Sequence, residues 1–282
     1  MREGRVLTNE QCEARLQSDI AKYYTQESWN RQARYLVSLV IEPERVENWK
    51  QYPYNLSFAK ELNLRFTAPL TFFVGENGSG KSTIIEAIAD KCRLPVEGGG
   101  PSELDTRPDS DRPRSQFARA LRASFVNHVH DGFFVRAENL VRFADLLEER
   151  ERDPDFYGNP YRAYGGRSMH QQSHGEAFLS LFQHRLQSGG VIVMDEPESA
   201  LSAQRQLTLL AMLYEFVQAG NTQIFIASHS PILMTFPGAC LLEVSEDGIN
   251  PIRLEDTSHY RITRGILANP EQYWKHLRAD AK

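Results

Sequence analysis

Apolar runs of strand length alternate with helical patterns along most of the chain. The first run, residues 35–41, is rich in β-branched side chains and is expected to open the core sheet. Later strand-like runs occupy 70–74, 132–135, 191–194, 223–227 and 241–244. Helical patterns follow at 82–91, 140–152, 202–219 and 271–277. This alternation predicts an α/β fold with a mainly parallel sheet covered by helices.

Chain length and loop composition indicate how these elements are organised. A chain of 282 residues is at the upper end of what one hydrophobic core supports, so we expect a single elaborated domain at 35–282. Residues 1–34 show no clear strand and are assigned as an N-terminal extension. Residues 97–114 combine three consecutive glycines with prolines and alternating charges, which is typical of a surface loop.

The overall composition limits the cellular compartments and the binding partners that we expect for this protein. The net charge of −5 gives no general reason to expect nucleic acid or an anionic membrane as a partner. No apolar run approaches the ~18 residues that would span a bilayer, so we expect a cytoplasmic protein without direct membrane insertion. Cys12, Cys92 and Cys240 lie far apart without a paired spacing, which argues against disulfides or a zinc site.

The segment Gly-Glu-Asn-Gly-Ser-Gly-Lys-Ser at 75–82 lies between a predicted strand and a predicted helix. Its glycines allow a tight loop whose backbone N–H groups face phosphates at the start of a helix. Lys81 can reach the β- and γ-phosphates of ATP, Ser82 can bind Mg²⁺, and Thr83 supports them. The predicted nucleotide-binding residues are Gly75, Glu76, Asn77, Gly78, Ser79, Gly80, Lys81, Ser82 and Thr83.

Two further strand ends carry polar groups suited to ATP hydrolysis. Asp195 and Glu196 follow an apolar strand, and alternation separates their tasks: Asp195 can hold the Mg²⁺ shell, and Glu196 can orient or deprotonate the attacking water. His229 follows the next strand, at the edge where α/β sheets collect ligands, and can contact the γ-phosphate. We therefore predict Glu196 and His229 as catalytic residues.

Four motifs stand in a fixed order: the phosphate loop, Gln-Ser-His-Gly-Glu at 172–176, Asp-Glu-Pro-Glu at 195–198, and Ser-His-Ser at 228–230. This order resembles the ABC-type ATPases, over roughly residues 35–280. Within that superfamily the chain is similar to compact bacterial ATPases related to the heads of chromosome-maintenance and DNA-repair proteins. The resemblance implies a P-loop NTPase fold with a small helical lobe at about 92–175.

In that superfamily two heads close face to face, and each ATP lies between the phosphate loop of one head and the signature segment of the other. Ser173 and Gly175 match that signature, so the resemblance implies an ATP-dependent homodimer. The signature here is Ser-His-Gly-Glu instead of Leu-Ser-Gly-Gly-Gln. The superfamily's Mg²⁺-side glutamine has no match; Arg136 and Glu138 are the alternatives, and we choose Glu138 as the third metal ligand beside Ser82 and Asp195.

Three other candidate sites are supported by fewer residues, and each has an alternative structural explanation. An adenine-stacking aromatic is either Tyr52 or Tyr54, with ordinary packing as the alternative. His128 and His130 would share one face of a strand, but no further ligand motif accompanies them. Nucleic acid stays open as a partner through one arginine group, although neighbouring acids favour a solvated loop; the group is Arg112, Arg114, Arg119 and Arg122.

The sequence leads to three functional hypotheses. The first is a standalone ATPase whose ATP-dependent dimerisation gates an unidentified protein client in DNA maintenance or defence. The second is the nucleotide-binding subunit of a membrane transporter, against which the altered signature and the missing glutamine count. The third is a binding module gated by nucleotide that hydrolyses slowly, which the intact Glu196 disfavours. A nuclease would need an acidic metal cluster that we do not recognise after His229.

Overall fold

A computed structural model describes residues 35–95, 115–154, 158–162, 166, 168, 174–185 and 189–279. Its main feature is a six-stranded sheet in the order β5-β6-β7-β3-β8-β9. The first five strands in this order are parallel to their neighbours, and only β9 is antiparallel to β8. The strands are β3 (Leu70–Val74), β5 (Gly132–Arg136), β6 (Gly190–Asp195), β7 (Thr222–Ala227), β8 (Cys240–Ser245) and β9 (Gly248–Pro251). The predicted α/β class with a mainly parallel sheet is therefore confirmed.

The central strands are buried on both faces, which explains why they appear in the sequence as continuous apolar runs. Along β3, Phe73 faces one hydrophobic core while Phe72 and Val74 face the other. In β7, Phe225 and Ile224 divide in the same way. Successive side chains alternate between the two faces, so each central strand contributes to both cores.

A second sheet has three antiparallel strands in the order β2-β1-β4. They are β1 (Leu36–Ile41), β2 (Asn63–Arg65) and β4 (Leu121–Phe125). The expectation that 35–41 opens the core sheet was wrong, because within the described ranges β1 pairs with these two strands and not with the main sheet. The buried side chain of Gln223 on β7 joins the two sheets instead: its Oε1 accepts from the N–H groups of Tyr35 and Leu36, and its Nε2 donates to the Leu36 carbonyl.

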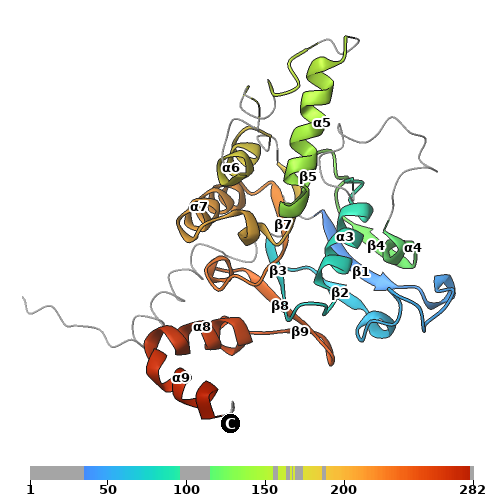
Figure 1. Cartoon of the computed structure of the whole chain (residues 1–282). Helices are drawn as coiled ribbons and strands as arrows, with labels where there is room; N and C mark the ends of the chain where they lie inside the picture. The colour runs from blue at the N-terminus through green and yellow to red at the C-terminus, as the bar shows by residue number, and fades with distance from the viewer. Residues whose placement is uncertain are drawn as a thin grey trace, which may run out of the picture.

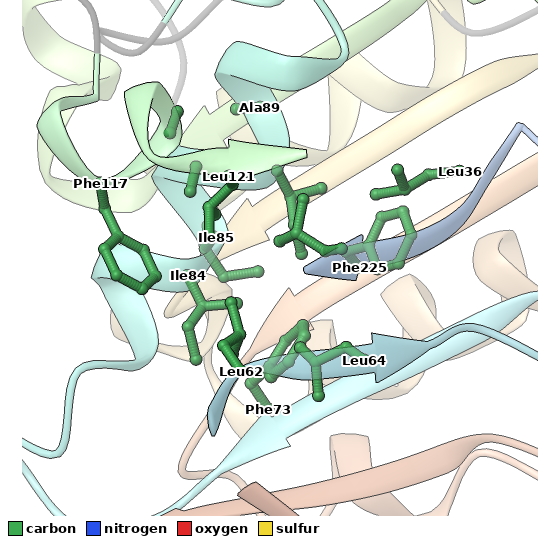
Figure 2. Packing of buried hydrophobic residues seen from close by; sticks show 14 of the residues in the cluster. Leu36, Leu62, Leu64, Phe73, Ile84, Ile85, Ala89, Phe117, Leu121 and Phe225 are labelled. Carbon is green, nitrogen blue, oxygen red and sulfur yellow. The ribbon is translucent and has the colours of Figure 1, made fainter. Parts of the chain in front are cut away.

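Helices cover both faces of the main sheet (Figure 1). Helix α3 and the small sheet enclose one core, whose packed side chains include Leu36, Phe73, Ile84 and Phe225 (Figure 2). Helices α5, α6 and α7 bury apolar residues in the other core. The helices are α3 (Lys81–Lys91), α4 (Gln116–Arg119), α5 (Leu140–Arg152), α6 (His174–Arg185), α7 (Ala203–Ala219), α8 (Ser258–Ala268) and α9 (Pro270–Ala279).

Parts of the expected organisation lie outside the described residues. The extension at 1–34 and the loop at 97–114, with Arg112 and Arg114, fall there. Arg119 and Arg122, the other two residues of the arginine group, are described. Within the range expected to form a helical lobe, β4 belongs to the small sheet and β5 belongs to the main sheet. The long helix in this range is α5. The sequence did not predict β2, β4, β9 or α8. No helix in the described part of the chain is long and apolar enough to cross a membrane.

Candidate functional site

The phosphate loop connects β3 to α3, and the conformation of its glycines explains their presence. Gly75 has φ +142°, and a Cβ atom there would lie 2.3 Å from the carbonyl oxygen of Val244. Gly80 has φ +100° at the N-cap of α3, where a Cβ would lie 2.8 Å from the Phe58 ring. The loop can therefore turn this tightly only with glycine at these positions. Gly78 has φ +80° and faces open space.

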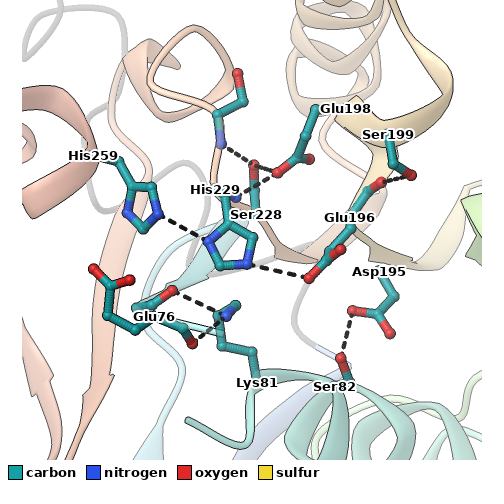
Figure 3. Close-up of polar contacts among 12 residues, drawn as sticks. Glu76, Lys81, Ser82, Asp195, Glu196, Glu198, Ser199, Ser228, His229 and His259 are labelled. Carbon is teal, nitrogen blue, oxygen red and sulfur yellow. Dashed lines mark hydrogen bonds and ion pairs between the residues drawn. The ribbon is translucent and has the colours of Figure 1, made fainter. Parts of the chain in front are cut away.

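Lys81 is the first residue of α3, and its ammonium group lies over the loop. Its Nζ donates to the carbonyl oxygens of Gly75 at 3.0 Å and Glu76 at 2.9 Å (Figure 3). Burial lowers the pKa of Lys81, and the surrounding carboxylates, led by Glu196 and Asp195, oppose that effect. The loop therefore holds a buried positive charge beside acidic groups.

Ser82 and Asp195 come together from α3 and the end of β6. The Ser82 hydroxyl donates to Asp195 Oδ1 at 3.1 Å, and Asp195 is only 7% exposed. Burial raises the pKa of Asp195, while Arg136 and the Ser82 hydrogen bond oppose the rise. Two hard oxygen groups in contact, one of them an acid, fit the preference of Mg²⁺ for oxygen ligands.

Arg136 occupies the end of β5 directly opposite Asp195 in the strand register. Its Nη2 lies 3.1 Å from Asp195 Oδ2 and 2.8 Å from Glu86 Oε1. Glu138, the predicted third metal ligand, contacts Arg136 Nε at 3.6 Å, and its side chain is 75% exposed. The structure thus brings Ser82 and Asp195 together but places Arg136, and not Glu138, against Asp195.

Glu196 and His229 form a second pair, also at the carboxyl ends of the parallel strands. Glu196 adopts the left-handed conformation, with φ 47° and ψ 53°, as the chain leaves β6. Its Oε1 lies 3.2 Å from Nε2 of His229, which follows β7. Burial lowers the pKa of His229, and the charge of Lys81 adds to that effect while Glu196 opposes it, so the net effect favours the neutral ring.

Sequence reasoning gave no role to Glu198, yet this residue links the two strand ends. Its Oε1 accepts from the Ser228 hydroxyl at 3.0 Å and from the backbone N–H of His229. Burial raises the pKa of Glu198, and these hydrogen bonds oppose the rise. The acid therefore fixes the backbone that carries His229. Its place two residues after Glu196, in the Asp-Glu-Pro-Glu motif, was the available signal.

Two residues at the start of α8 also reach the site and were missed. The Ser258 hydroxyl donates to Glu76 Oε1 at 3.0 Å. His259 Nε2 lies 3.0 Å from His229 Nδ1 (Figure 3). Neither residue belongs to a recognisable motif, and α8 itself was not predicted. Only the three-dimensional structure brings them to the phosphate loop.

The remaining predicted residues have varied environments. Thr83 is buried, and its hydroxyl lies 2.9 Å from the hydroxyl of Tyr52, a residue that is 61% exposed. Tyr54 instead packs in the core against Phe117, which favours Tyr52 of the two adenine candidates. Asn77 is exposed in the loop, and Ser79 has a buried hydroxyl.

The signature residues are only partly described. Ser173 lies outside the described residues, as does the side chain of His174. Gly175 is buried in the first turn of α6, where a Cβ would lie 2.5 Å from Arg205 Nη1. His128 and His130, expected on one strand face, lie instead in the connection between β4 and β5.

A glycine loop between a parallel strand and a helix, with a Ser–Asp pair at the carboxyl end of another parallel strand, defines a P-loop NTPase. Residues 45–90 match a family described as "AAA domain". Residues 103–235 match one described as "AAA domain, putative AbiEii toxin, Type IV TA system".

Two curated proteins and one solved structure are similar to this chain. The hemin import ATP-binding protein HmuV of Pseudomonas aeruginosa is 32% identical over 59% of this chain and 68% of its own length. The zinc import ATP-binding protein ZnuC 1 of Aliivibrio fischeri is 24% identical over 62% of this chain and 62% of its own length. A solved ATP-binding cassette of an ABC transporter, in its ADP conformation, is 16% identical, with a TM-score of 0.46 over 83% of this chain and all of its own.

The chain belongs to the ABC-type ATPases, which hydrolyse ATP. The expected superfamily is therefore confirmed. The finer similarity to chromosome-maintenance and DNA-repair heads rests on the sequence motifs alone.

Proposed function

We propose that this ATPase binds and hydrolyses ATP at the edge of the sheet where the phosphate loop, the end of β6 and the end of β7 meet. One observation carries the proposal: two polar pairs converge beside the Lys81 ammonium group. Ser82 lies 3.1 Å from Asp195, and His229 lies 3.2 Å from Glu196. The first pair suits a metal ion and the second suits a water molecule and its proton.

Each residue has a chemical task in this proposal. Lys81 and the loop N–H groups bind the phosphates, while Ser82 and Asp195 would hold Mg²⁺, which supplies positive charge to the phosphate oxygens. Glu196 orients a water molecule and takes its proton as the water oxygen bonds to the γ-phosphorus. The bond from that phosphorus to the β–γ bridging oxygen breaks, and ADP leaves. His229 holds the Glu196 carboxylate through Nε2.

We further propose that a second copy of the chain completes each site through the segment around Ser173 and Gly175. Support comes from the start of α6, which the neighbouring helix holds in place. Arg205 of α7 packs against Gly175 and pairs with Glu176 at 3.1 Å. A fixed helix start can present N–H groups to a phosphate across an interface.

The partner that uses this cycle belongs to the proposal as well. The named relatives are import ATP-binding proteins, which favours a membrane transporter chain over a client in DNA maintenance. A second candidate is a defence function, favoured by the family description that mentions a type IV toxin system. Turnover measured with and without double-stranded DNA separates the partner classes. Stimulation of turnover by DNA would contradict the transporter assignment.

The hydrolytic site itself is tested by paired substitutions. Glu196→Gln should retain ATP binding and lower kcat by about a hundredfold or more, because the amide cannot accept the proton from water. Lys81→Ala should instead weaken ATP binding by about tenfold or more, since it removes charged hydrogen bonds to phosphate. Glu215→Gln, an exposed acid on α7, is the matched control and should leave both properties unchanged. Unchanged turnover in Glu196→Gln would remove Glu196 as the base.

A further inference from the structure

The first turn of α8 contacts His229, one of the two proposed catalytic residues, and the phosphate loop. His259 Nε2 lies 3.0 Å from His229 Nδ1, and the two rings are 4.8 Å apart with a tilt of 56° (Figure 3). Ser258, the preceding residue, donates to the Glu76 carboxylate at 3.0 Å. One short segment therefore contacts both the phosphate loop and the histidine at the end of β7.

The position of this turn is fixed by its own capping residue. Thr257 is only 1% exposed, and its hydroxyl donates to the Leu254 carbonyl at 2.7 Å. The same oxygen accepts from the N–H of Tyr260, which makes Thr257 the N-cap of α8. His259 is therefore held at a defined place in the first turn, next to His229.

The hydrogen-bond partners of His229 determine which of its ring nitrogens carries hydrogen. The Glu196 carboxylate can only accept a hydrogen bond, so the His229 Nε2 that lies 3.2 Å from it must carry the hydrogen. Burial and the charge of Lys81 lower the pKa of His229 and favour its neutral form, in which Nδ1 is an acceptor. The only group at hydrogen-bond distance from Nδ1 among the described residues is His259 Nε2, which must then be the donor.

We infer that His259 is a positioning residue for ATP hydrolysis. By donating Nε2–H to His229 Nδ1, it holds His229 in the Nε2–H tautomer and directs that hydrogen at Glu196. The inference rests on the proposed roles of Glu196 and His229. Without His259, the His229 ring can exchange tautomers or rotate, and Glu196 loses a fixed donor.

Substitutions of His259 that keep or remove the donor test this role. His259→Leu should lower kcat by about tenfold and change KM by less than about twofold, because one orienting hydrogen bond is lost while phosphate binding is retained. His259→Gln should stay near the wild-type kcat, since its amide N–H can reach His229. His259→Asn, polar but too short to reach, should behave like His259→Leu. The exposed His130→Leu is the matched control and should not change kcat.

A second measurement follows the tautomer without nucleotide or turnover. Ring-nitrogen NMR should show His229 protonated at Nε2 alone in the wild type and in His259→Gln, and a tautomer mixture in His259→Leu and His259→Asn. Unfolding curves identify any variant that fails to fold. If His259→Leu and His259→Asn keep both kcat and the single tautomer while Glu196→Gln stops turnover, the role of His259 is overturned and the proposed function stands. If Glu196→Gln still turns over ATP, the proposed function fails instead.

Discussion

Gly75 shows how a single residue type is required by the phosphate loop. Its φ of +142° belongs to a region that side chains rarely adopt, and the carbonyl oxygen of Val244 fills the space where a Cβ would stand. Val244 lies on β8, which pairs with β3 on the side away from β7. The loop therefore packs directly against the backbone of a neighbouring strand, so that its shape and the sheet depend on each other.

Replacing Gly75 with alanine should therefore affect stability and binding together. We expect Gly75→Ala to lower the free energy of unfolding by about 3 kcal/mol, from backbone strain and the clash with Val244. ATP binding should weaken as well, because the loop must move. Urea unfolding and ATP titration measure the two effects.

Gly220→Ala provides the control for this prediction. Gly220 also has a positive φ, of +72°, but nothing lies within 4 Å of its missing Cβ. Gly220→Ala should lower the free energy of unfolding by about 1 kcal/mol and leave ATP binding unchanged. Equal losses of stability in the two variants would show that the close approach of Val244 has no effect.

The link between the two sheets depends on one side chain of β7. Gln223 is fully buried and makes three hydrogen bonds to the backbone around the start of β1, at 3.1, 2.9 and 2.8 Å. The backbone groups of Tyr35 and Leu36 therefore find their partners in a side chain of the other sheet. Such buried groups are costly when left without a partner.

Gln223→Leu should consequently destabilise the fold more than its similar volume suggests. We expect a loss of about 3 kcal/mol or more in the free energy of unfolding, because three backbone groups lose their partners in the core. Gln204→Leu, on the exposed face of α7, should change stability by less than about 0.5 kcal/mol. Urea unfolding of both variants checks the difference. A small loss in Gln223→Leu would mean that β1 is held by packing alone.

The sequence was most informative where local pattern and position coincide. The strands and loop that carry Lys81, Asp195 and His229 follow from apolar runs that end in polar motifs. By contrast, the pairing of β1 depends on strands far along the chain, which a local pattern does not specify. His259 lies 30 residues after His229 in a helix without a recognised motif, so only folding reveals the contact.

Arg136 illustrates a second limit of sequence reasoning. Arg136 is the last residue of β5 and Glu138 follows the strand, and both were weighed for the position of the superfamily's glutamine. A carboxylate is the better metal ligand in general, but the strand register places Arg136 opposite Asp195. The direction of a side chain at a strand end, and not its chemistry alone, determines which residue reaches the site.

At the scale of the whole molecule, the proposed site lies at one edge of the main sheet. Its residues come from α3, from the end of β6 and from the segments that follow β3, β6 and β7, and α8 contacts the group on one side. Glu196 is 43% exposed, so this edge is open to solvent in the single chain. An open edge with a charged centre is suited to being covered by a second copy once ATP is bound, because the nucleotide adds contacts for both partners.

This arrangement leads to a prediction about mass in solution. Glu196→Gln binds ATP but does not hydrolyse it in our proposal, so it should accumulate the closed state. Light scattering after gel filtration should show a shift from monomer to dimer with Mg-ATP and no shift without it. Ser173→Arg in the same background should retain ATP binding and stay monomeric, because the bulky charge occupies the interface. Lys81→Ala should also stay monomeric, but through loss of ATP binding. A dimer that persists in Ser173→Arg would place the contact elsewhere, and a mass that ignores ATP despite bound nucleotide would mean that closure needs the partner chain.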